Sequence, residues 1–154
     1  METFVSDRVG RTFILKLVQG EDLLGSVERM IREEGIENAV VVSGIATFDR
    51  SRLHMISTTG YPADVYIDEK TDVPLEVVSV EGFICDGQPH LHGTISDKNG
   101  AYAGHLLEGC RILYLGELVI QELLGLDIHR HLTEKGVNHI YPKGVVSKSL
   151  KELT

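Results

Sequence analysis

The chain has 154 residues, of which 42% are hydrophobic and 25% are charged, which is ordinary usage for a globular domain and excludes a fibrous or largely disordered chain. Its 23 acidic residues outnumber its 15 basic residues, and the formal net charge is −8. Because nucleic-acid affinity depends mainly on Lys and Arg that neutralise phosphates, this balance disfavours a nucleic-acid partner. We expect a single domain over residues 1–154.

No run of apolar residues approaches the roughly twenty that are needed to span a bilayer. The first residues, METFVSDRVG, lack the charged start and apolar stretch of a signal peptide. We therefore expect a soluble, cytoplasmic protein with no membrane partner. The two cysteines, Cys85 and Cys110, are too few for a disulfide framework, and we expect both to be small, buried hydrophobic side chains.

The first part of the chain predicts a strand region followed by a helix. Residues 3–18 contain apolar runs on either side of RVGR and predict a strand or a hairpin. In GEDLLGSVERMIREEG, residues 20–35, the acidic Glu21 and Asp22 suit a helix N-terminus and Gly35 suits its end. Apolar side chains recur between them at helical spacing, with charges on the opposite face; these are Leu23, Leu24, Val27, Met30 and Ile31.

Beyond residue 35 the pattern takes the period of strands. The runs ENAVVVSGIATF, SRLHMIS, PLEVVSVEGFIC, PHLHGTIS, AYAGHLL and RILYLGELVIQEL are β-branched or alternating, and Gly, Asp, Asn and Pro divide them. YPADVYIDEKTDVP, residues 61–74, predicts an acidic loop, and residues 126–154 predict a short helix or strand before a polar tail. The whole pattern predicts an α+β fold with a mostly antiparallel sheet and one main helix packed on it.

Three histidines lie close together in PHLHGTISDKNGAYAGHLLEGC, residues 89–110. His90 and His92 are separated by one residue, so on a strand they point to the same face, about 7 Å apart. The letters SDKNG that follow predict a tight turn, in which Asn99 and Gly100 tolerate positive φ.

The turn decides where the third histidine lies. If Lys98–Asn99 are its two central residues, His92 faces His105 and His90 faces Leu107 across the hairpin. The three imidazoles then converge on one face. A loop of odd length would instead turn His105 to the other face, so this prediction depends on strand register.

Three converging imidazoles favour a metal site. They suit a tetrahedral ion with three nitrogens at about 2.0–2.1 Å and a fourth position open. Neutral imidazole suits zinc, although iron, nickel and copper are alternatives. We predict zinc, or another divalent transition metal, on His90, His92 and His105. Gly93 and Gly104 flank these ligands and either clear space for a bound molecule or relieve crowding.

A second histidine group occurs in DIHRHLTEKGVNH, at His129, His131 and His139. An even turn at Glu134–Lys135 would place His139 opposite Arg130, on the wrong face, and only an odd loop would align it with His131. We rank this group well below the first as a metal site. His54, alone in SRLHMIS, is interpreted as a structural or surface histidine.

The segment EGFICDGQPHLHGTISDKNGAYAGHLLEGCRILYLGELVI resembles the signature of the plants-and-prokaryotes conserved (PPC, or PCC) domain, which follows AT-hooks in plant nuclear proteins. GEDLLGSVERMIREEGI and NAVVVSGIATF match earlier blocks of that family, so the resemblance covers roughly residues 10–122. It implies a curved antiparallel sheet, assembly as a homotrimer, and a metal, usually zinc, on His90, His92 and His105. The fold of this family also resembles that of acetolactate decarboxylase, a zinc enzyme; this is an analogy of fold and implies no activity.

The chain departs from the family pattern at Ala46, where a second glycine is common, and matches nothing after Leu126. The family's DNA-binding label comes largely from the AT-hooks of the plant proteins. Because this acidic chain contains no basic stretch of the RGRP type, the label transfers poorly, and charge disfavours nucleic acid.

Two classes of function fit these observations. In the first, a metal-stabilised trimer has a regulatory or interaction role and engages a protein partner, or a small-molecule ligand at the metal. In the second, a zinc-dependent lyase or hydrolase acts on a small carbonyl or carboxylate substrate at the open metal position. We favour the first.

An enzyme of the second class would need a carboxylate beside the ion. Glu117 is the candidate, since it shares a strand face with apolar side chains and burial would raise its pKa. The alternative for Glu117 is an edge residue turned to solvent or a partner of Arg111. Asp86 either orients an imidazole of the site or is a turn residue.

Overall fold

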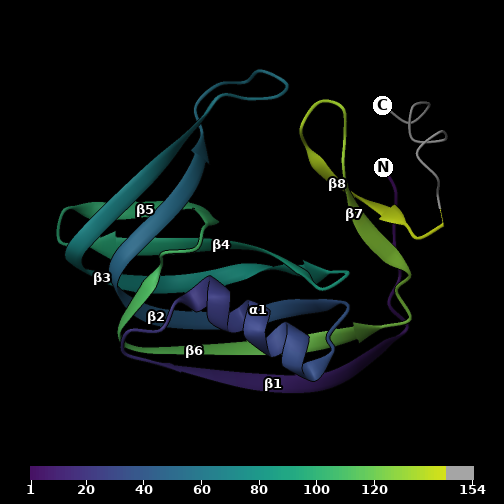
Figure 1. The fold of residues 1–154 in the computed structure, drawn as a ribbon, viewed down its shortest axis with the longest axis horizontal. Helices are drawn as coiled ribbons and strands as arrows, with labels where there is room; N and C mark the ends of the chain where they lie inside the picture. Colours follow the sequence, from purple (N-terminus) through teal and green to yellow (C-terminus); the bar gives the residue numbers. More distant parts are fainter. Residues whose placement is uncertain (145–154) are drawn as a thin grey trace.

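A computed structural model describes residues 1–144 and is drawn in Figure 1. Six strands form one sheet in the order β1-β6-β2-β3-β4-β5, and β7 and β8 form a separate hairpin. Every pairing is antiparallel. The elements are β1 (Arg8–Val18), α1 (Leu23–Glu34), β2 (Ala39–Ile56), β3 (Val65–Cys85), β4 (Gln88–Asp97), β5 (Gly100–Leu106), β6 (Arg111–Leu124), β7 (Ile128–Leu132) and β8 (Asn138–Pro142). The predicted mostly antiparallel sheet with a single main helix is confirmed, although the helix is short.

Helix α1 has the predicted position and ends. The carboxylate of Asp22 caps its N-terminus by accepting a hydrogen bond from the N–H of Gly25 at 2.8 Å, and Gly35 ends it at φ 65°. Its apolar stripe, which includes the fully buried Leu23 and Val27, packs on one face of the sheet. Among the described residues, no helix is both long and apolar enough to cross a bilayer.

Alternation along the strands separates a core face from an outer face. On β4, Leu91 and Ile95 are fully buried in the core that α1 covers. His90 and His92 alternate with them and therefore project from the outer face. The fold thus places the histidines on the side of the sheet that the helix leaves free.

The predicted acidic loop at residues 61–74 is wrong for most of its length. Only residues 57–64 connect β2 and β3, and β3 already begins at Val65. Two strands were predicted, one ending and the next beginning near residue 50. They form a single bent strand, β2. Its second half pairs with the β-branched and aromatic start of β3, which outweighs the local acidic composition.

The end of β2 also pairs with β5, through Leu53 with Leu106 and His54 with His105. This pairing closes strands β2 to β5 on themselves. At the other end of the sheet, residues 3–18 supply one edge strand, β1, rather than a hairpin.

The chain after β6 forms the hairpin β7–β8. A short helix or a strand was predicted for this segment, and the strand is correct. The amide of Asn38 donates to the carbonyl of Leu126 at 3.1 Å at the base of this hairpin. The predicted polar tail, residues 145–154, lies outside the described residues.

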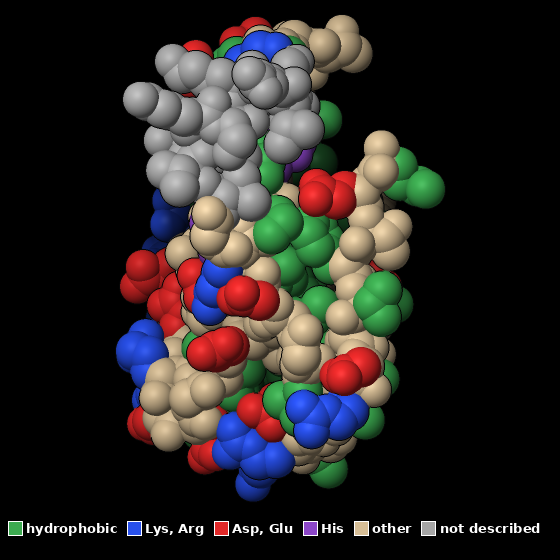
Figure 2. Space-filling model, turned by 90° about the vertical axis from the view of Figure 1, so that its right-hand side faces the viewer, with side chains coloured by type: hydrophobic (Ala, Val, Ile, Leu, Met, Phe, Trp, Pro, Cys, Tyr) green, Lys and Arg blue, Asp and Glu red, His purple; other side chains and the backbone are tan. Residues whose placement is uncertain are grey.

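The molecular surface carries charges of both signs. Figure 2 shows Lys and Arg side chains interspersed with Asp and Glu on one face, with apolar side chains between them. On that face no extended basic surface is present, in keeping with the net charge of −8.

Candidate metal centre

The β4–β5 hairpin has the predicted register. His92 lies directly opposite His105, and Asp97 opposite Gly100. The turn was predicted from the tolerance of Asn99 and Gly100 for positive φ. That reason is wrong, because neither residue has a positive φ. Instead, the Asp97 carboxylate accepts hydrogen bonds from the N–H groups of both, at 2.7 and 3.1 Å, so an Asx-type turn sets the register.

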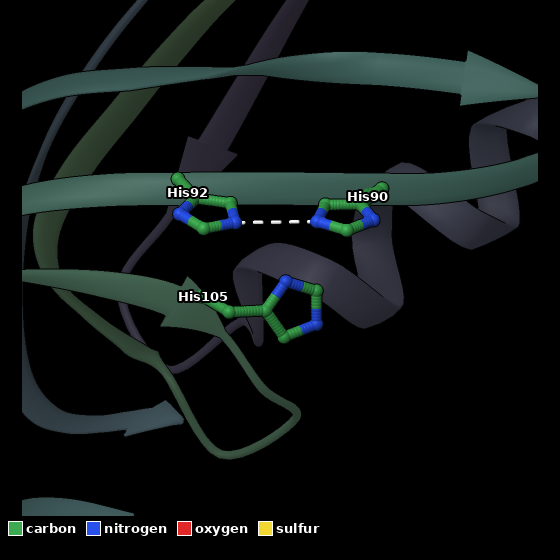
Figure 3. A group of neighbouring side chains, drawn as sticks. All are labelled: His90, His92 and His105. Atoms are coloured by element: carbon green, nitrogen blue, oxygen red, sulfur yellow. Dashed lines mark hydrogen bonds between the residues drawn. The ribbon is translucent and has the colours of Figure 1, made fainter. Parts of the chain in front are cut away.

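Figure 3 shows the His90 and His92 rings side by side on β4, with His105 reaching toward them from β5. The ring centroids of His90 and His92 are 5.3 Å apart, and that of His105 lies 4.7 Å from His90 and 5.3 Å from His92. Ligand nitrogens of all three lie within 4.8 Å of one another, and no other such group of three occurs among the described residues. The structure therefore brings the three predicted ligands together.

Two observations test whether this group fits a metal ion. The Nε2 atoms of His90 and His92 are 3.2 Å apart, close to the roughly 3.3 Å between two ligands 2.0–2.1 Å from a tetrahedral zinc ion. The Nδ1 atom of His105 is buried and has no hydrogen-bond partner, and its ring points toward the other two (Figure 3). An ion at this position would satisfy that nitrogen, so the residues fit the group.

The surroundings of His105 and His90 favour the neutral form of their imidazoles. Burial, reinforced by the neighbouring His90, His92 and His54, lowers the pKa of His105 to about 4. Burial also lowers the pKa of His90, with smaller effects from Arg130 and His92. Neutral imidazole is the form that binds metals, so little proton competition is expected at neutral pH.

One predicted pairing does not form. His90 was expected to face Leu107, but β5 ends at Leu106. The N–H of Leu107 donates instead to the carbonyl of Arg52 at 3.1 Å, because the chain there turns toward β2. The side of the site next to His90 is therefore not covered by β5.

Sequence reasoning missed a carboxylate next to the site. Asp86 and Gly87 have φ of 52° and 72° and form the tight turn between β3 and β4, so the interpretation of Asp86 as a turn residue is confirmed. This turn places Glu81, which is exposed, directly opposite His92 on the same face. The Asp-Gly dipeptide is the strongest short hairpin signal, and counting back from it would have found Glu81.

His54, interpreted as structural or surface, lies directly opposite His105 with ring centroids 5.9 Å apart. Glu81, His92, His105 and His54 therefore form one row across four strand segments. Beside this row is a hollow of about 70 Å³, lined by Ser79, Glu81, His92, Gly93, Thr94, Ala103 and Gly104.

Gly93 and Gly104 are explained by crowding on the inner side of their strands. A Cβ on Gly93 would come within 3.0 Å of the Leu106 side chain, and one on Gly104 within 3.0 Å of Met55. These contacts support the relief of crowding, and the same two glycines also line the hollow beside His92.

Glu117 is exposed, so the burial predicted to raise its pKa is wrong. It lies on β6 opposite Ile45 of β2. Ile45 precedes His54, the β2 residue opposite His105, by nine positions along β2, and Glu117 does not belong to the histidine group. Arg111 does not pair with it, but binds Asp49 through two hydrogen bonds of 2.8 and 2.9 Å.

In the second histidine group, the loop that joins the two strands has an odd number of residues. Residues 133–137 connect β7 and β8, and His139 lies opposite His131. The group still does not gather its nitrogens as the first group does, because Tyr141 lies among the rings, 6.2–6.4 Å from each by centroid.

Both cysteines are buried and unpaired, as predicted. Burial raises the pKa of Cys110 to about 11 and also raises the pKa of Cys85. Neither thiol belongs to the histidine group.

Comparison with known proteins places this site in a context. The model of the Plants and Prokaryotes Conserved (PCC) domain matches residues 5–124. A bifunctional protein GlmU from a Synechococcus strain is 29% identical over 113 residues, which cover 73% of this chain but only 17% of that protein. A second Synechococcus GlmU is similar to the same extent. The chain thus spans about a sixth of the length of these curated relatives.

Solved structures share the fold. The metal-containing protein AF0104 from Archaeoglobus fulgidus is 24% identical, with a TM-score of 0.78 over 92% of this chain and 99% of that one. A plant- and prokaryote-conserved protein from Pyrococcus horikoshii is 27% identical, with a TM-score of 0.73 over 90% and 94%. A presumed DNA-binding protein from Bacteroides thetaiotaomicron is 19% identical, with a TM-score of 0.73 over 91% and 98%. The expected kinship with acetolactate decarboxylase stays a prediction.

Proposed function

We propose, from the premise that this chain belongs to the Plants and Prokaryotes Conserved (PCC) domain family, that it is a zinc-binding domain. His90, His92 and His105 would hold the ion. The observation that carries this proposal is the convergence of their ring nitrogens, with a buried and unpartnered Nδ1 on His105. Similarity in fold to a metal-containing protein supports it.

The ion would supply a fixed positive charge and a Lewis acid at the fourth position. Neutral imidazoles favour zinc, with iron, nickel and copper as the alternatives. Cross-linking β4 to β5 would also hold the end of the sheet in one conformation, which suits a structural or regulatory use.

We further propose that the domain assembles as a homotrimer. Ile14, Val18, Ile45, Val78 and Leu115 are exposed on the outer face of the sheet, around the exposed pair Lys16–Glu117, and form what we call the outer apolar patch. Grouped apolar side chains of this kind mark an interaction surface. The threefold arrangement itself rests on the resemblance to the family.

A regulatory or interaction role fits the site best. The hollow beside His92, about 70 Å³, is well below the roughly 300–1,000 Å³ of pockets that enclose drug-sized ligands. The site therefore offers an open face to a partner or a very small ligand. A nucleic-acid partner is disfavoured because of the net charge of −8 and the mixed charges in Figure 2.

Glu81 favours a second candidate function, a zinc-dependent lyase or hydrolase acting on a small carbonyl or carboxylate substrate. Its carboxylate lies on the same face as His92, directly across the β3–β4 pair. Such a group could exchange a proton with a molecule at the open metal position. Glu81 thus takes the place that sequence analysis assigned to Glu117.

Metal content tests the main proposal. The full chain, purified after zinc supplementation, is expected to carry about one zinc per chain by elemental analysis. His92→Ala is expected to lose most of it, while His131→Ala, a matched histidine variant in β7, keeps it. Less than about a third of an equivalent in the unaltered protein, with circular dichroism showing a folded chain, would refute the site.

A further inference from the structure

The turn that leads from β4 into β5 carries the dipeptide Asn99–Gly100. Both residues are exposed, as is Lys98 before them. Asparagine followed by glycine is the sequence in which an asparagine side chain closes most readily on the next main-chain nitrogen, because glycine has no Cβ to shield that nitrogen. The turn that sets the register of the candidate metal centre therefore contains a chemically reactive pair.

Asp97 holds this pair in place. Its Oδ1 atom accepts hydrogen bonds from the N–H of Asn99 at 2.7 Å and from the N–H of Gly100 at 3.1 Å. The hydrogen bond from Asn99 and, more weakly, that from Gly100 lower the pKa of Asp97, so the carboxylate is ionised at neutral pH. The nitrogen of Gly100, which would be the nucleophile, therefore keeps its proton beside a negative charge.

The two other asparagines of the chain lack this combination. Asn38 is only 4% exposed, its amide nitrogen is already hydrogen-bonded, and Ala39 follows it. Asn138 is exposed, but His139 follows it and places a Cβ beside the main-chain nitrogen. Sequence and exposure together single out Asn99.

We propose that Asn99 is a deamidation site whose reaction is restrained by Asp97, and that its conversion to isoaspartate weakens the metal centre. The first part is independent of any metal. The second part rests on the proposed metal-binding function.

The reaction needs only water. The main-chain nitrogen of Gly100 bonds to Cγ of Asn99 while the Cγ–Nδ2 bond breaks, and the proton of the Gly100 N–H leaves with Nδ2 as ammonia. This closes a succinimide ring, which water then opens at one of its two carbonyl carbons. Opening at Cγ gives aspartate. Opening at the main-chain carbonyl carbon gives isoaspartate, in which the main chain runs through Cβ and Cγ and is one carbon longer.

Isoaspartate at this position would disturb the register on which the metal centre depends. Asp97 binds the N–H groups of residues 99 and 100 together because an ordinary residue spaces them. A longer main chain removes this match from a two-residue turn. The strands β4 and β5 then lose the restraint that keeps His92 opposite His105.

The experiment ages the full, zinc-loaded chain in mildly alkaline buffer and compares each variant with its own fresh sample. Ammonia release and peptide mass mapping locate deamidation, enzymatic methylation measures isoaspartate, and elemental analysis follows zinc. Amide hydrogen exchange in β4 and β5 reports the register without reference to the metal. Ammonia release also separates this reaction from isomerisation at Asp86–Gly87, which releases none.

Three variants separate the steps. In Asp97→Ser, a hydroxyl can form the same type of turn more weakly and without a charge. In Gly100→Ala, the added Cβ shields the nitrogen but meets no atom closer than the Tyr102 hydroxyl at 4.0 Å. Asn99→Asp carries the charge of the product on a main chain of ordinary length.

Asn99 is expected to deamidate before Asn38 and Asn138. The rate should rise roughly tenfold in Asp97→Ser, the factor implied by the loss of one hydrogen bond to a charged group, and should fall several-fold in Gly100→Ala. Zinc content should fall in step with the isoaspartate fraction while hydrogen exchange in β4 and β5 rises. Asn99→Asp should keep its zinc.

Deamidation of Asn38 or Asn138 ahead of Asn99 would overturn the site, and a rate in Asp97→Ser no higher than in the unaltered chain would overturn the restraint. Full zinc content in isoaspartate-containing protein, or an equal zinc loss in Asn99→Asp, would overturn the effect on the metal centre. Failure of the metal-binding proposal has a different signature, namely the absence of zinc from the fresh unaltered chain. The ammonia and hydrogen-exchange measurements still test the reaction and the register in that case.

Discussion

His105 lies directly opposite His92 in the β4–β5 ladder, and this pairing completes the candidate metal centre. Because side chains alternate along a strand, a shift of one residue would send the His105 ring to the core face. The Asp97 side chain prevents this shift by binding the N–H groups of Asn99 and Gly100. The turn at residues 98–99 thus decides whether the three imidazoles converge.

The lowered pKa of His105 predicts acid sensitivity in the metal-free protein. Burial lowers this pKa to about 4, against 6.5 for an ordinary histidine. The unfolded chain therefore binds the proton more readily, so stability is fully present above about pH 6.5 and is lost as the pH falls toward 4. We expect the urea midpoint of metal-free protein to fall over this range, and to fall less in His105→Gln.

The matched control for this prediction is His131→Gln, which removes a histidine from β7, outside the metal centre. Its urea midpoint should follow that of the unaltered chain between pH 4 and 7. Parallel curves for His105→Gln and the unaltered chain would show that His105 does not carry the acid sensitivity. Zinc should raise the midpoint of the unaltered chain, since it binds only the folded state strongly.

The metal centre could be predicted from the sequence because its geometry is local. A two-residue turn at residues 98–99 fixes which strand positions face each other, and this turn is readable from the letters DKNG. The position of Glu81 opposite His92 could also be predicted, by counting the β3–β4 register back from the Asp-Gly turn that joins these strands. The error at Glu117 has another origin, since its apolar face turned out to be the outer face of the sheet.

Other features depended on contacts between distant segments. Whether His139 faces His131 depends on a loop of five or four residues, and the letters TEKGV permit both. The position of the β7–β8 hairpin next to the β3–β4 turn depends on hydrogen bonds through Asn38 and Asp86, which lie far away in the sequence. No local pattern in residues 126–144 indicates that docking.

Gly82 tests the coupling between β3 and the metal centre. A Cβ at this position would overlap the backbone oxygen of His90 and crowd Leu91, and the residue has a φ of 152°. Gly82→Ala should therefore displace His90, weaken zinc binding, and lower the unfolding free energy by about 1–3 kcal/mol, as overpacking usually does. Zinc titration and urea unfolding measure the two effects.

Gly25→Ala is the control for Gly82, because Gly25 lies in α1 and an added Cβ there makes only ordinary contacts. It should leave zinc binding unchanged and stabilise the protein by up to about 1 kcal/mol, since alanine is the better helix former. If Gly82→Ala bound zinc as the unaltered chain does, the placement of the His90 backbone against β3 would be wrong.

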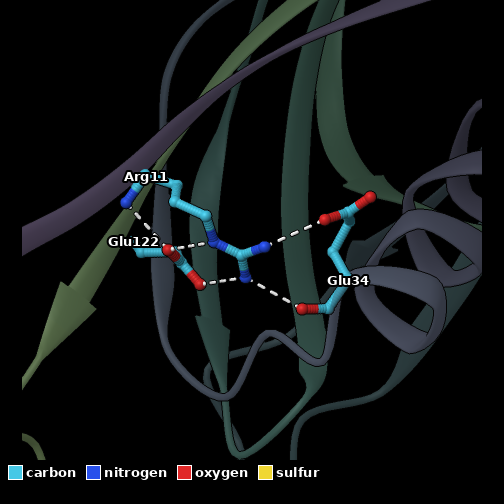
Figure 4. Close-up of polar contacts among 3 residues, drawn as sticks. All are labelled: Arg11, Glu34 and Glu122. Atoms are coloured by element: carbon cyan, nitrogen blue, oxygen red, sulfur yellow. Dashed lines mark hydrogen bonds and ion pairs between the residues drawn. The ribbon is translucent and has the colours of Figure 1, made fainter.

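Glu122 joins three elements through Arg11, as Figure 4 shows. The Arg11 guanidinium donates to both oxygens of Glu122, at 2.7 and 2.9 Å, and to the side chain of Glu34 at 2.9 Å. Glu122 itself is only 8% exposed. The hydrogen bonds from Arg11 lower the pKa of Glu122 below its ordinary value of 4.5. The two ion pairs of Arg11, with Glu122 and with Glu34, connect β1 to β6 and α1.

A lowered pKa gives the carboxylate a stabilising effect that is present above about pH 4.5 and lost as the pH falls through the pKa of the folded state. We expect Glu122→Gln to lower Tm at pH 7, and the difference from the unaltered chain to shrink below pH 4. Glu33→Gln, an exposed variant on α1, should change Tm little at either pH. A difference that stays constant from pH 7 to pH 3 would contradict this account.

The outer apolar patch predicts the oligomeric state. Light scattering after gel filtration should give a mass about three times the chain mass of 17.0 kDa. Ile45→Lys should convert most of the protein to monomer, because it removes an apolar side chain from the patch and adds a further charge beside Glu117 and Lys16. The monomer should stay folded, since the new ammonium group would face Glu117 across the β2–β6 pair.

Ile56→Lys is the control for the patch, because Ile56 is also exposed but lies at the far end of β2. It should leave the mass unchanged. A monomeric unaltered chain would refute the self-association proposal, and a trimeric Ile45→Lys would show that the contact lies elsewhere. In both cases zinc content is measured on the same sample, so that a loss of assembly is distinguished from a loss of the metal centre.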